Sequence, residues 1–175
     1  SGFQFFNPPP SVKNSIRDLK KKPARFWEDK GKKMMLKLIR FMYQEVPAYR
    51  ILLKRKGLNP STIKKQGDFA KLPILDKSSY LKKNSFSHLL PKKNVSHITT
   101  FSATSGSTGE PFYFPRGEEQ DWQYEYVTEM FLKNQWAIDK TRTLGVIGFG
   151  FGSWIGGIFT YKNFNQLARK GYPIS

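Results

Sequence analysis

The chain has no cysteine, only two histidines and no long apolar run, and each absence excludes a class of protein. Without cysteine there is no disulfide framework, no thiolate zinc site and no cysteine nucleophile. His88 and His97 are too few for a typical multi-histidine metal site, so we expect no metal site. The apolar stretches fall far short of the roughly 20 residues that cross a bilayer, and no export leader is visible. We therefore expect a cytoplasmic protein without a transmembrane segment.

Acidic residues are also scarce, because 13 Asp and Glu accompany 30 Lys and Arg, for a formal net charge of +17. The imbalance is N-terminal: residues 1–95 hold 23 basic and 6 acidic residues, whereas residues 96–175 hold 7 of each. Such a segment can bind nucleic acid, an anionic lipid surface or an acidic protein. Apolar helix positions, rather than stacked aromatic residues, separate its Lys-Lys pairs, which favours a solvated face over a nucleic-acid partner.

The first part of the chain combines a proline run with helical spacing. Prolines 8–10 fix the backbone and remove donors, so we expect an extended or weakly ordered basic segment over residues 1–31. Residues 32–95 are predicted to form a helical region, because apolar residues recur at spacings of three and four from Met35 to Val46. Pro47 should end that first helix.

Two shorter helices are expected further along this region. The first covers residues 48–56, with Ile51, Leu52 and Leu53 inward and Gly57 as a left-handed stop. Asp76 is placed to cap the second, which would run through Leu81.

From residue 96 the pattern changes to that of an α/β nucleotide-binding domain. Residues 97–101 and 112–114 read as short strands around a polar loop, and residues 118–136 carry helical spacing with acids in the first turn. A buried strand over 143–149, a helix over about 158–170 and the start of another strand near 171–175 should follow. The predicted fold class is α/β, with a helical N-terminal region and part of a mixed sheet with flanking helices. Since two or three strands seldom make a whole sheet, we expect this domain to be incomplete.

The strongest motif is the loop between the first two predicted strands. It combines two glycines with four hydroxyl residues before Pro111, and its backbone N–H groups and hydroxyls suit a polyphosphate. It is not a Walker A loop and not a Gly-x-Ser-x-Gly nucleophile elbow, since the spacing differs and no lysine follows. The candidate phosphate-binding residues are Thr104, Ser105, Gly106, Ser107, Thr108 and Gly109.

This loop resembles the signature Thr-Ser-Gly-Ser/Thr-Thr-Gly-x-Pro of the adenylate-forming (AMP-binding, acyl-CoA synthetase) superfamily, and it matches every fixed position. The flanking residues 46–50, 57–58 and 69–77 look like the N-terminal region of phenylacetate–CoA ligases and the related CapK-like proteins. The similarity spans roughly residues 45–175. Phe112 stands where many members carry a lysine.

A second glycine cluster, residues 148–157, follows the predicted buried strand. It departs from the dinucleotide-binding Gly-x-Gly-x-x-Gly pattern, because Ser153 occupies the place of the third glycine. In phenylacetate–CoA ligase relatives a similar turn helps to line the acyl or aryl pocket, and core packing of the aromatic residues is the alternative. The candidate substrate-pocket residues are Phe149, Gly150, Phe151, Trp154 and Gly156.

The resemblance implies a two-step reaction that uses ATP, Mg²⁺ and coenzyme A. A carboxylic acid is first adenylated, and a thiol then displaces AMP. The family's adenine, ribose, hinge and catalytic lysine segments are not found in this chain, so the resemblance places the catalytic residues beyond Ser175, in a C-terminal part that would be a partner of this fragment. We expect little or no activity from the fragment.

Two other interpretations stay open. The basic residues could form a non-catalytic module that binds a polyanionic partner, or the chain could be a degenerate ligase relative that has lost its chemistry. The sequence assigns a catalytic role to neither histidine, and His97 is expected to be an ordinary strand residue.

Overall fold

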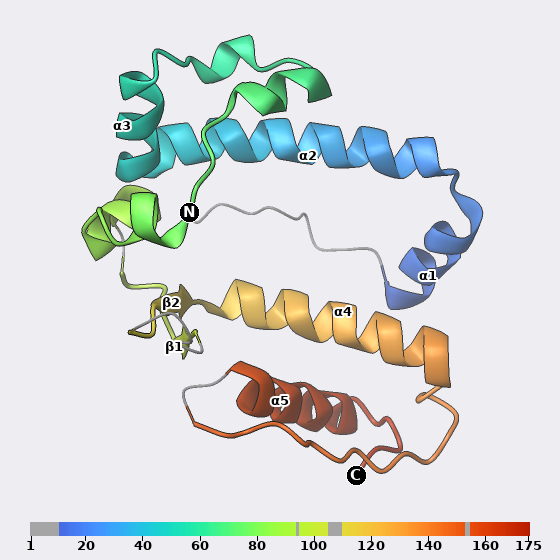
Figure 1. Ribbon diagram of the computed structural model, residues 1–175. Coiled ribbons are helices and arrows are strands. Elements are labelled where there is room, and N and C mark those ends of the chain that lie inside the picture. The colour runs from blue at the N-terminus through green and yellow to red at the C-terminus, as the bar shows by residue number, and fades with distance from the viewer. Residues whose placement is uncertain (1–10, 94, 105–109, 153–154) are drawn as a thin grey trace. The chain divides into compact units, whose positions relative to one another are not determined.

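The computed structural model describes residues 11–93, 95–104, 110–152 and 155–175 (Figure 1). The described residues are mostly helical, with one small antiparallel sheet of two strands. They form two compact units, of which the N-terminal unit holds residues 21–96 and the C-terminal unit holds residues 11–20 and 97–175. This arrangement is compatible with a helical region followed by part of an α/β domain. Within the described ranges, the helices are too short or too polar to cross a membrane.

Most of the described part of the basic segment before residue 32 is helical, so the predicted extended segment is wrong from residue 12 onward. Helix α1 (Val12–Lys21) and helix α2 (Ala24–Glu45) together cover almost all of residues 12–31. Val12, Ile16 and Leu19 recur at spacings of four and three, a helical signal that the proline run just before it obscured. Pro23 precedes α2, where a residue without a backbone donor is tolerated. Residues 1–10 lie outside the described residues.

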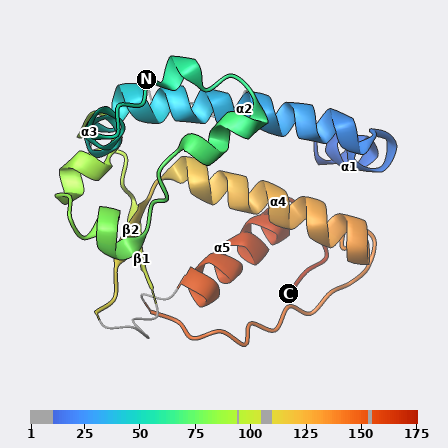
Figure 2. The same ribbon diagram turned by 45° about the horizontal axis from the view of Figure 1, so that its top comes forward.

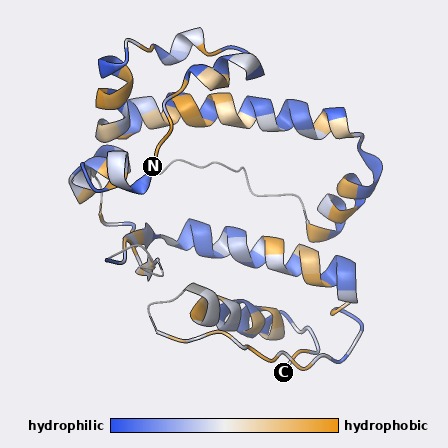
Figure 3. Ribbon diagram, viewed as in Figure 1, coloured by the Kyte–Doolittle hydropathy of each residue, from blue (hydrophilic) through white to orange (hydrophobic). Residues whose placement is uncertain are grey.

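The core of the N-terminal unit forms where α2 meets α3 (Pro47–Arg55). The predicted break is confirmed, because α2 ends at Glu45 and Pro47 opens α3. Gly57 has a φ of +64°, which confirms the predicted left-handed stop. Figure 3 shows hydrophilic and hydrophobic residues alternating along α2. The buried residues are Val46, Tyr49 and Leu53, with Met42, Tyr43, Leu58 and Leu72 packed against them.

Ile51 corrects part of the prediction for α3. Its side chain is 40% exposed, whereas Leu53 is fully buried. Three consecutive residues of an α-helix spread over more than half of its circumference, so they cannot all face one core. Ile51 therefore lies outside the buried face of α3, although it adjoins buried residues in the sequence.

Short helical turns complete the N-terminal unit, and carboxylates fix two of them. Asp76 accepts hydrogen bonds from the amides of Ser78 and Ser79, which confirms it as the cap of the turn at residues 77–81. Hydrogen bonds from Ser79 and then Ser78 hold the pKa of Asp76 well below its usual range. Asp68 accepts from Lys71, Lys64 and Lys65, with the same effect on its pKa. The turns are η1 (Pro60–Thr62), η2 (Gln66–Lys71), η3 (Lys77–Leu81), η4 (Phe86–Leu89) and η5 (Pro91–Lys93).

In the C-terminal unit, the two predicted strands are confirmed as an antiparallel pair, and residues 105–109 between them lie outside the described residues. Strand β1 (Thr100–Ala103) pairs antiparallel with β2 (Tyr113–Arg116), and Thr100 lies opposite Arg116. Helix α4 (Glu118–Trp136) follows directly and has the predicted bounds, with acidic residues in its first turn, where the helix dipole favours them. Helix α5 (Ile155–Arg169) lies beside α4 in both ribbon views (Figure 1, Figure 2).

The predicted buried strand over residues 143–149 is wrong. Leu144 and Val146 are 76% and 83% exposed. Among the described residues, this segment forms one isolated parallel bridge, between Thr143 and Ile174, and no strand. Helix α5 covers one face, because a side chain at Gly145 would lie 2.7 Å from the Phe164 ring. The bridge agrees with a strand start near residue 174.

A buried carboxylate in the second half of α4 binds two side chains that follow α5 directly. Glu129 accepts hydrogen bonds from the Lys170 ammonium at 2.8 Å and the Tyr172 hydroxyl at 2.7 Å. Burial would raise the pKa of Glu129, but these two hydrogen bonds outweigh it and hold the pKa below its ordinary value of 4.5. The neighbouring core consists of Ile138, Leu167 and Ile174, with Leu132, Phe164 and Tyr172 packed against it.

Glu129→Gln should lower the free energy of unfolding by about 2 kcal/mol, because it replaces charge-assisted hydrogen bonds by weaker ones in a buried place. Denaturant unfolding at pH 7 measures the loss. The carboxylate contributes stability above its ordinary pKa of 4.5, and that contribution is lost as the pH falls through its lower folded value. The variant should lack this part of the acid dependence. Glu118→Gln, at an exposed position of the same helix, should cost less than about 1 kcal/mol. Equal losses in the two variants would contradict the role of Glu129.

Candidate functional site

The hairpin holds both ends of the candidate phosphate loop together. The backbone N–H of Thr104 donates to the carbonyl of Phe112 at 3.0 Å. The side-chain oxygen of Thr104 accepts from the backbone N–H of Phe112 at 2.9 Å. Thr104, the first candidate residue, is therefore placed at the neck of the loop, where its hydroxyl closes the turn. The other five candidates, Ser105, Gly106, Ser107, Thr108 and Gly109, lie outside the described residues.

A nearly buried arginine anchors this hairpin to the two helices of the C-terminal unit. The Arg116 side chain is 17% exposed and approaches the carboxylate of Asp121 in α4 at 3.5 Å. Its guanidinium carbon lies 4.1 Å from the centre of the Phe159 ring in α5, within cation–π range. Lys162 of α5 completes the cluster, with its ammonium 3.5 Å from Asp121. The guanidinium at the end of β2 thus contacts both α4 and α5.

Close backbone packing holds the second glycine cluster on the first turn of α5. A side chain at Gly157 would lie 2.5 Å from the carbonyl oxygen of Gly150, and one at Gly156 would lie 3.0 Å from the Phe149 ring. These glycines allow the segment before the helix to fold back over it. Gly152 has a φ of +112°, which also favours glycine.

The candidate pocket residues are only partly brought together. The Phe149 ring lies against Gly156, and Gly150 lies against Gly157. Phe149 and Phe151 are 62% and 59% exposed, so the alternative that these two rings are core is not supported. Trp154 lies outside the described residues.

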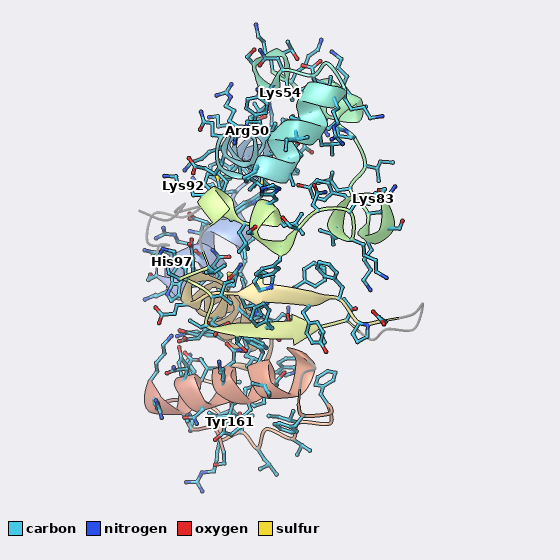
Figure 4. The ribbon with its side chains drawn as sticks, turned by 90° about the vertical axis from the view of Figure 1, so that its left-hand side faces the viewer. Arg50, Lys54, Lys83, Lys92, His97 and Tyr161 are labelled. Atoms are coloured by element: carbon cyan, nitrogen blue, oxygen red, sulfur yellow. The ribbon has the colours of Figure 1, made fainter. Side chains whose placement is uncertain are left out.

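His97 borders this site through its backbone. The carbonyl of His97, not its ring, matters locally, because a side chain at Gly117 would lie 2.7 Å from it. His97 is therefore next to the start of α4 and close to the hairpin (Figure 4). Among the described residues, no three His, Asp or Glu side chains gather in a way that could hold a metal ion.

A comparison with known proteins finds a distant relative whose name matches the family that the loop motif resembles. The chain is 25% identical, over 140 residues, to a phenylacetate-coenzyme A ligase from Aromatoleum evansii. The similarity is to an acid–CoA ligase, and it is distant. The match covers 78% of this chain and 30% of the relative, so the chain spans about 30% of the length of the curated relative that it matches. No protein-family model matches the chain.

The sequence analysis did not identify the Arg116 cluster. Arg116, Asp121, Phe159 and Lys162 are spread over more than 40 residues and belong to no motif. The available signal was weak: Arg116 lies two residues after a predicted strand, and Asp121 lies in the first turn of the next predicted helix. Only the packing of α5 on α4 brings Phe159 and Lys162 to them.

Gly157→Ala should lower the free energy of unfolding of the C-terminal unit by about 1–2 kcal/mol. The new methyl group would collide with the Gly150 carbonyl, and the gain in helix propensity offsets only part of that strain. Gly148→Ala is the matched control, because nothing lies within 4 Å of its added methyl group. Thermal unfolding of both variants measures the difference. A Gly157→Ala protein as stable as the control would show that the segment does not pack on α5 as described.

Proposed function

We propose that this chain is the N-terminal part of an ATP-dependent carboxylic acid–CoA ligase of the phenylacetate–CoA ligase and CapK-like type. The observation that carries the proposal is the loop at residues 104–111, which has the family's signature and whose neck is closed by Thr104 and Phe112. The distant similarity to a phenylacetate-coenzyme A ligase supports it. In this proposal residues 96–175 begin the nucleotide-binding domain, and residues 32–95 form the helical region before it.

The loop's proposed role is to hold the β and γ phosphates of ATP. Its hydroxyls and backbone N–H groups would stabilise the charge that builds on the pyrophosphate as it leaves. The closed neck at Thr104 supports this role, because the proposal requires donors that are positioned before the reaction and need no reorganisation during it. The loop positions a substrate and transfers no proton.

The proposed reaction has two balanced steps. A carboxylate oxygen attacks the α-phosphorus of ATP, and the bond to pyrophosphate breaks, which gives an acyl-adenylate. A thiolate of coenzyme A then attacks the acyl carbon, and AMP leaves with the electron pair of the broken C–O bond. Phe149 and Phe151 are proposed to contribute, with Gly150, Trp154 and Gly156, to an apolar slot for the acid. The catalytic residues and the coenzyme A site are proposed to lie in the parts of the parent protein that this chain does not contain.

Mg²⁺ enters this proposal with ATP and not through a protein cage. The described residues offer no cluster of three acidic or histidine side chains, and Mg²⁺ in such enzymes is held largely by substrate phosphates and water. Glu110, an exposed residue next to the loop, is the nearest carboxylate in sequence. No step is assigned to the ion.

The charge distribution favours a second candidate function, a basic module that binds a polyanion. Residues 1–95 carry 23 basic against 6 acidic residues, and side chains such as Arg50 and Lys54 project from α3 (Figure 4). This surface would bind through counterion release, with a steep dependence on salt. A degenerate relative that keeps the loop without the chemistry is the third candidate.

Ser105→Ala and Thr108→Ala should each weaken ATP binding by about ten-fold, because each removes a hydrogen bond to a charged oxygen. Isothermal titration with ATP measures the loss. Thr141→Ala, which removes an exposed hydroxyl elsewhere in the same unit, should bind ATP like the parent chain. Binding of a single-stranded oligonucleotide at low salt should not change in any of the three. Unchanged ATP affinity in both loop variants would refute the proposed phosphate site and leave the polyanion module as the better explanation.

The 175-residue chain alone should show little or no acid-dependent exchange of labelled pyrophosphate into ATP. It lacks the family's adenine, ribose and catalytic lysine segments, so a bound ATP would have no partner for adenylation. Exchange assays with phenylacetate and with octanoate test this. Robust exchange from a homogeneous preparation would contradict the expectation, whereas ATP binding without exchange supports it.

A further inference from the structure

Helix α2 carries an exposed basic face that contributes nothing to the core of its unit. Residues three and four positions apart are neighbours on the surface of a helix. Starting from Phe26, these spacings lead to one basic residue after another, and every side chain of the series is exposed. At 1.5 Å per residue, the series runs for about 21 Å along the helix. The basic face of α2 consists of Phe26, Lys30, Lys33, Lys37 and Arg40.

Acidic residues do not interrupt this face. Asp29, beside it, lies 4.0 Å from Arg25 and 3.6 Å from Lys32, and neither of these partners belongs to the face. Like charges at spacings of three and four repel each other and destabilise a helix. An anionic partner laid along the face would relieve this repulsion, so the charge pattern of α2 is complementary to an extended negative surface.

Two aromatic rings lie at the start of the basic face. Phe26, which is 40% exposed, meets Trp27 edge to face, with ring centres 5.1 Å apart and planes at 88°. The ammonium of Lys22 lies 5.3 Å from the centre of the Phe26 ring, and that of Lys30 lies 5.4 Å from the centre of the Trp27 ring. Aromatic rings next to lysines, on a helix with a basic face, are typical of helices that lie in a membrane interface.

The arrangement of the two rings favours a lipid surface over a nucleic acid. Proteins that bind single strands offer open ring faces on which successive bases stack. Here the rings are perpendicular, and a lysine lies over each of them. At a bilayer the same lysines can reach the lipid phosphates while the exposed edge of Phe26 enters the layer below. The straight line of charges also suits a flat anionic surface.

We propose that the basic face of α2 binds the surface of an anionic lipid bilayer. The helix lies parallel to the bilayer, with its lysines against the lipid head groups and with Phe26 and Trp27 in the interfacial layer. This proposal names the partner of the basic module, the second candidate function, on which it rests. It requires neither ATP nor the loop at residues 104–111.

Sedimentation of the whole chain with lipid vesicles is the measurement. Vesicles of phosphatidylserine and phosphatidylcholine should bind the chain, and vesicles of phosphatidylcholine alone should bind it far more weakly. Combined replacement of Lys30, Lys33 and Lys37 by Gln should weaken binding to the anionic vesicles by about 100-fold, because each lysine at such a surface contributes about five-fold.

The matched control replaces Lys54, Lys82 and Lys83 by Gln, three exposed residues of the same unit that lie outside α2. It removes the same net charge, so it separates the basic face from the overall charge of the chain. Its binding to anionic vesicles should fall by less than about ten-fold. Both triple variants should keep the helix content of the parent chain in circular dichroism, because the replaced side chains are exposed.

The aromatic pair gives a second readout, since the other three tryptophans all lie beyond residue 120. Anionic vesicles should shift the tryptophan emission of the parent chain to shorter wavelength, and Trp27→Phe should remove that shift. Phe26→Ala should weaken vesicle binding by about ten-fold, because less apolar surface leaves water.

Three results would overturn the proposal: no binding to anionic vesicles, equal losses in the two triple variants, or an emission shift that Trp27→Phe retains. A single-stranded oligonucleotide at low salt separates this failure from that of the basic module. If the α2 triple variant loses oligonucleotide binding and the parent chain binds no vesicles, the module stands and its partner is a nucleic acid. Ser105→Ala should leave vesicle binding unchanged, which keeps the ATP site a separate question.

Discussion

The C-terminal unit depends on the contacts of a single guanidinium. Arg116 ends β2, yet it touches Asp121 of α4 and the Phe159 ring of α5. Its Nε atom is buried and has no hydrogen-bond partner among the described residues, so charge and ring contact, rather than directed hydrogen bonds, hold the group. A guanidinium in such a place is tolerated only while its counter-charge stays beside it. This requirement fixes the hairpin on the helices, and with it the neck of the loop that Thr104 closes.

The glycines of residues 148–157 act through their lack of a side chain and not through a nucleotide motif. Gly157 and Gly150 bring two backbones into contact, and Gly156 accommodates the Phe149 ring. The exposed Phe149 and Phe151 rings, together with Leu144 and Val146, give this unit an apolar surface around a short parallel pairing. Residues apolar on both faces are typical of parallel strands that are covered on both sides.

The two units differ in net charge and in what their carboxylates bind. The N-terminal unit carries the excess of positive charge, and its carboxylates, Asp68 and Asp76, are used to fix short turns. The C-terminal unit is closer to balance, with 10 basic and 8 acidic residues, and its buried carboxylate Glu129 contacts Lys170 and Tyr172 just after α5. The same residue types therefore serve local turn geometry in one unit and packing between helices in the other.

Local rules were sufficient for the elements whose signals lie within a few residues. Pro47 and Gly57 bound α3, Asp76 caps its turn, and the polar loop joins two short strands, all from the sequence alone, because capping, proline and glycine effects act locally. Tertiary structure decided the rest. Packing between segments distant in sequence decided that residues 144 and 146 are exposed and that the Phe149 and Phe151 rings face solvent. It also brought Arg116 to Phe159. No local sequence pattern encodes such packing.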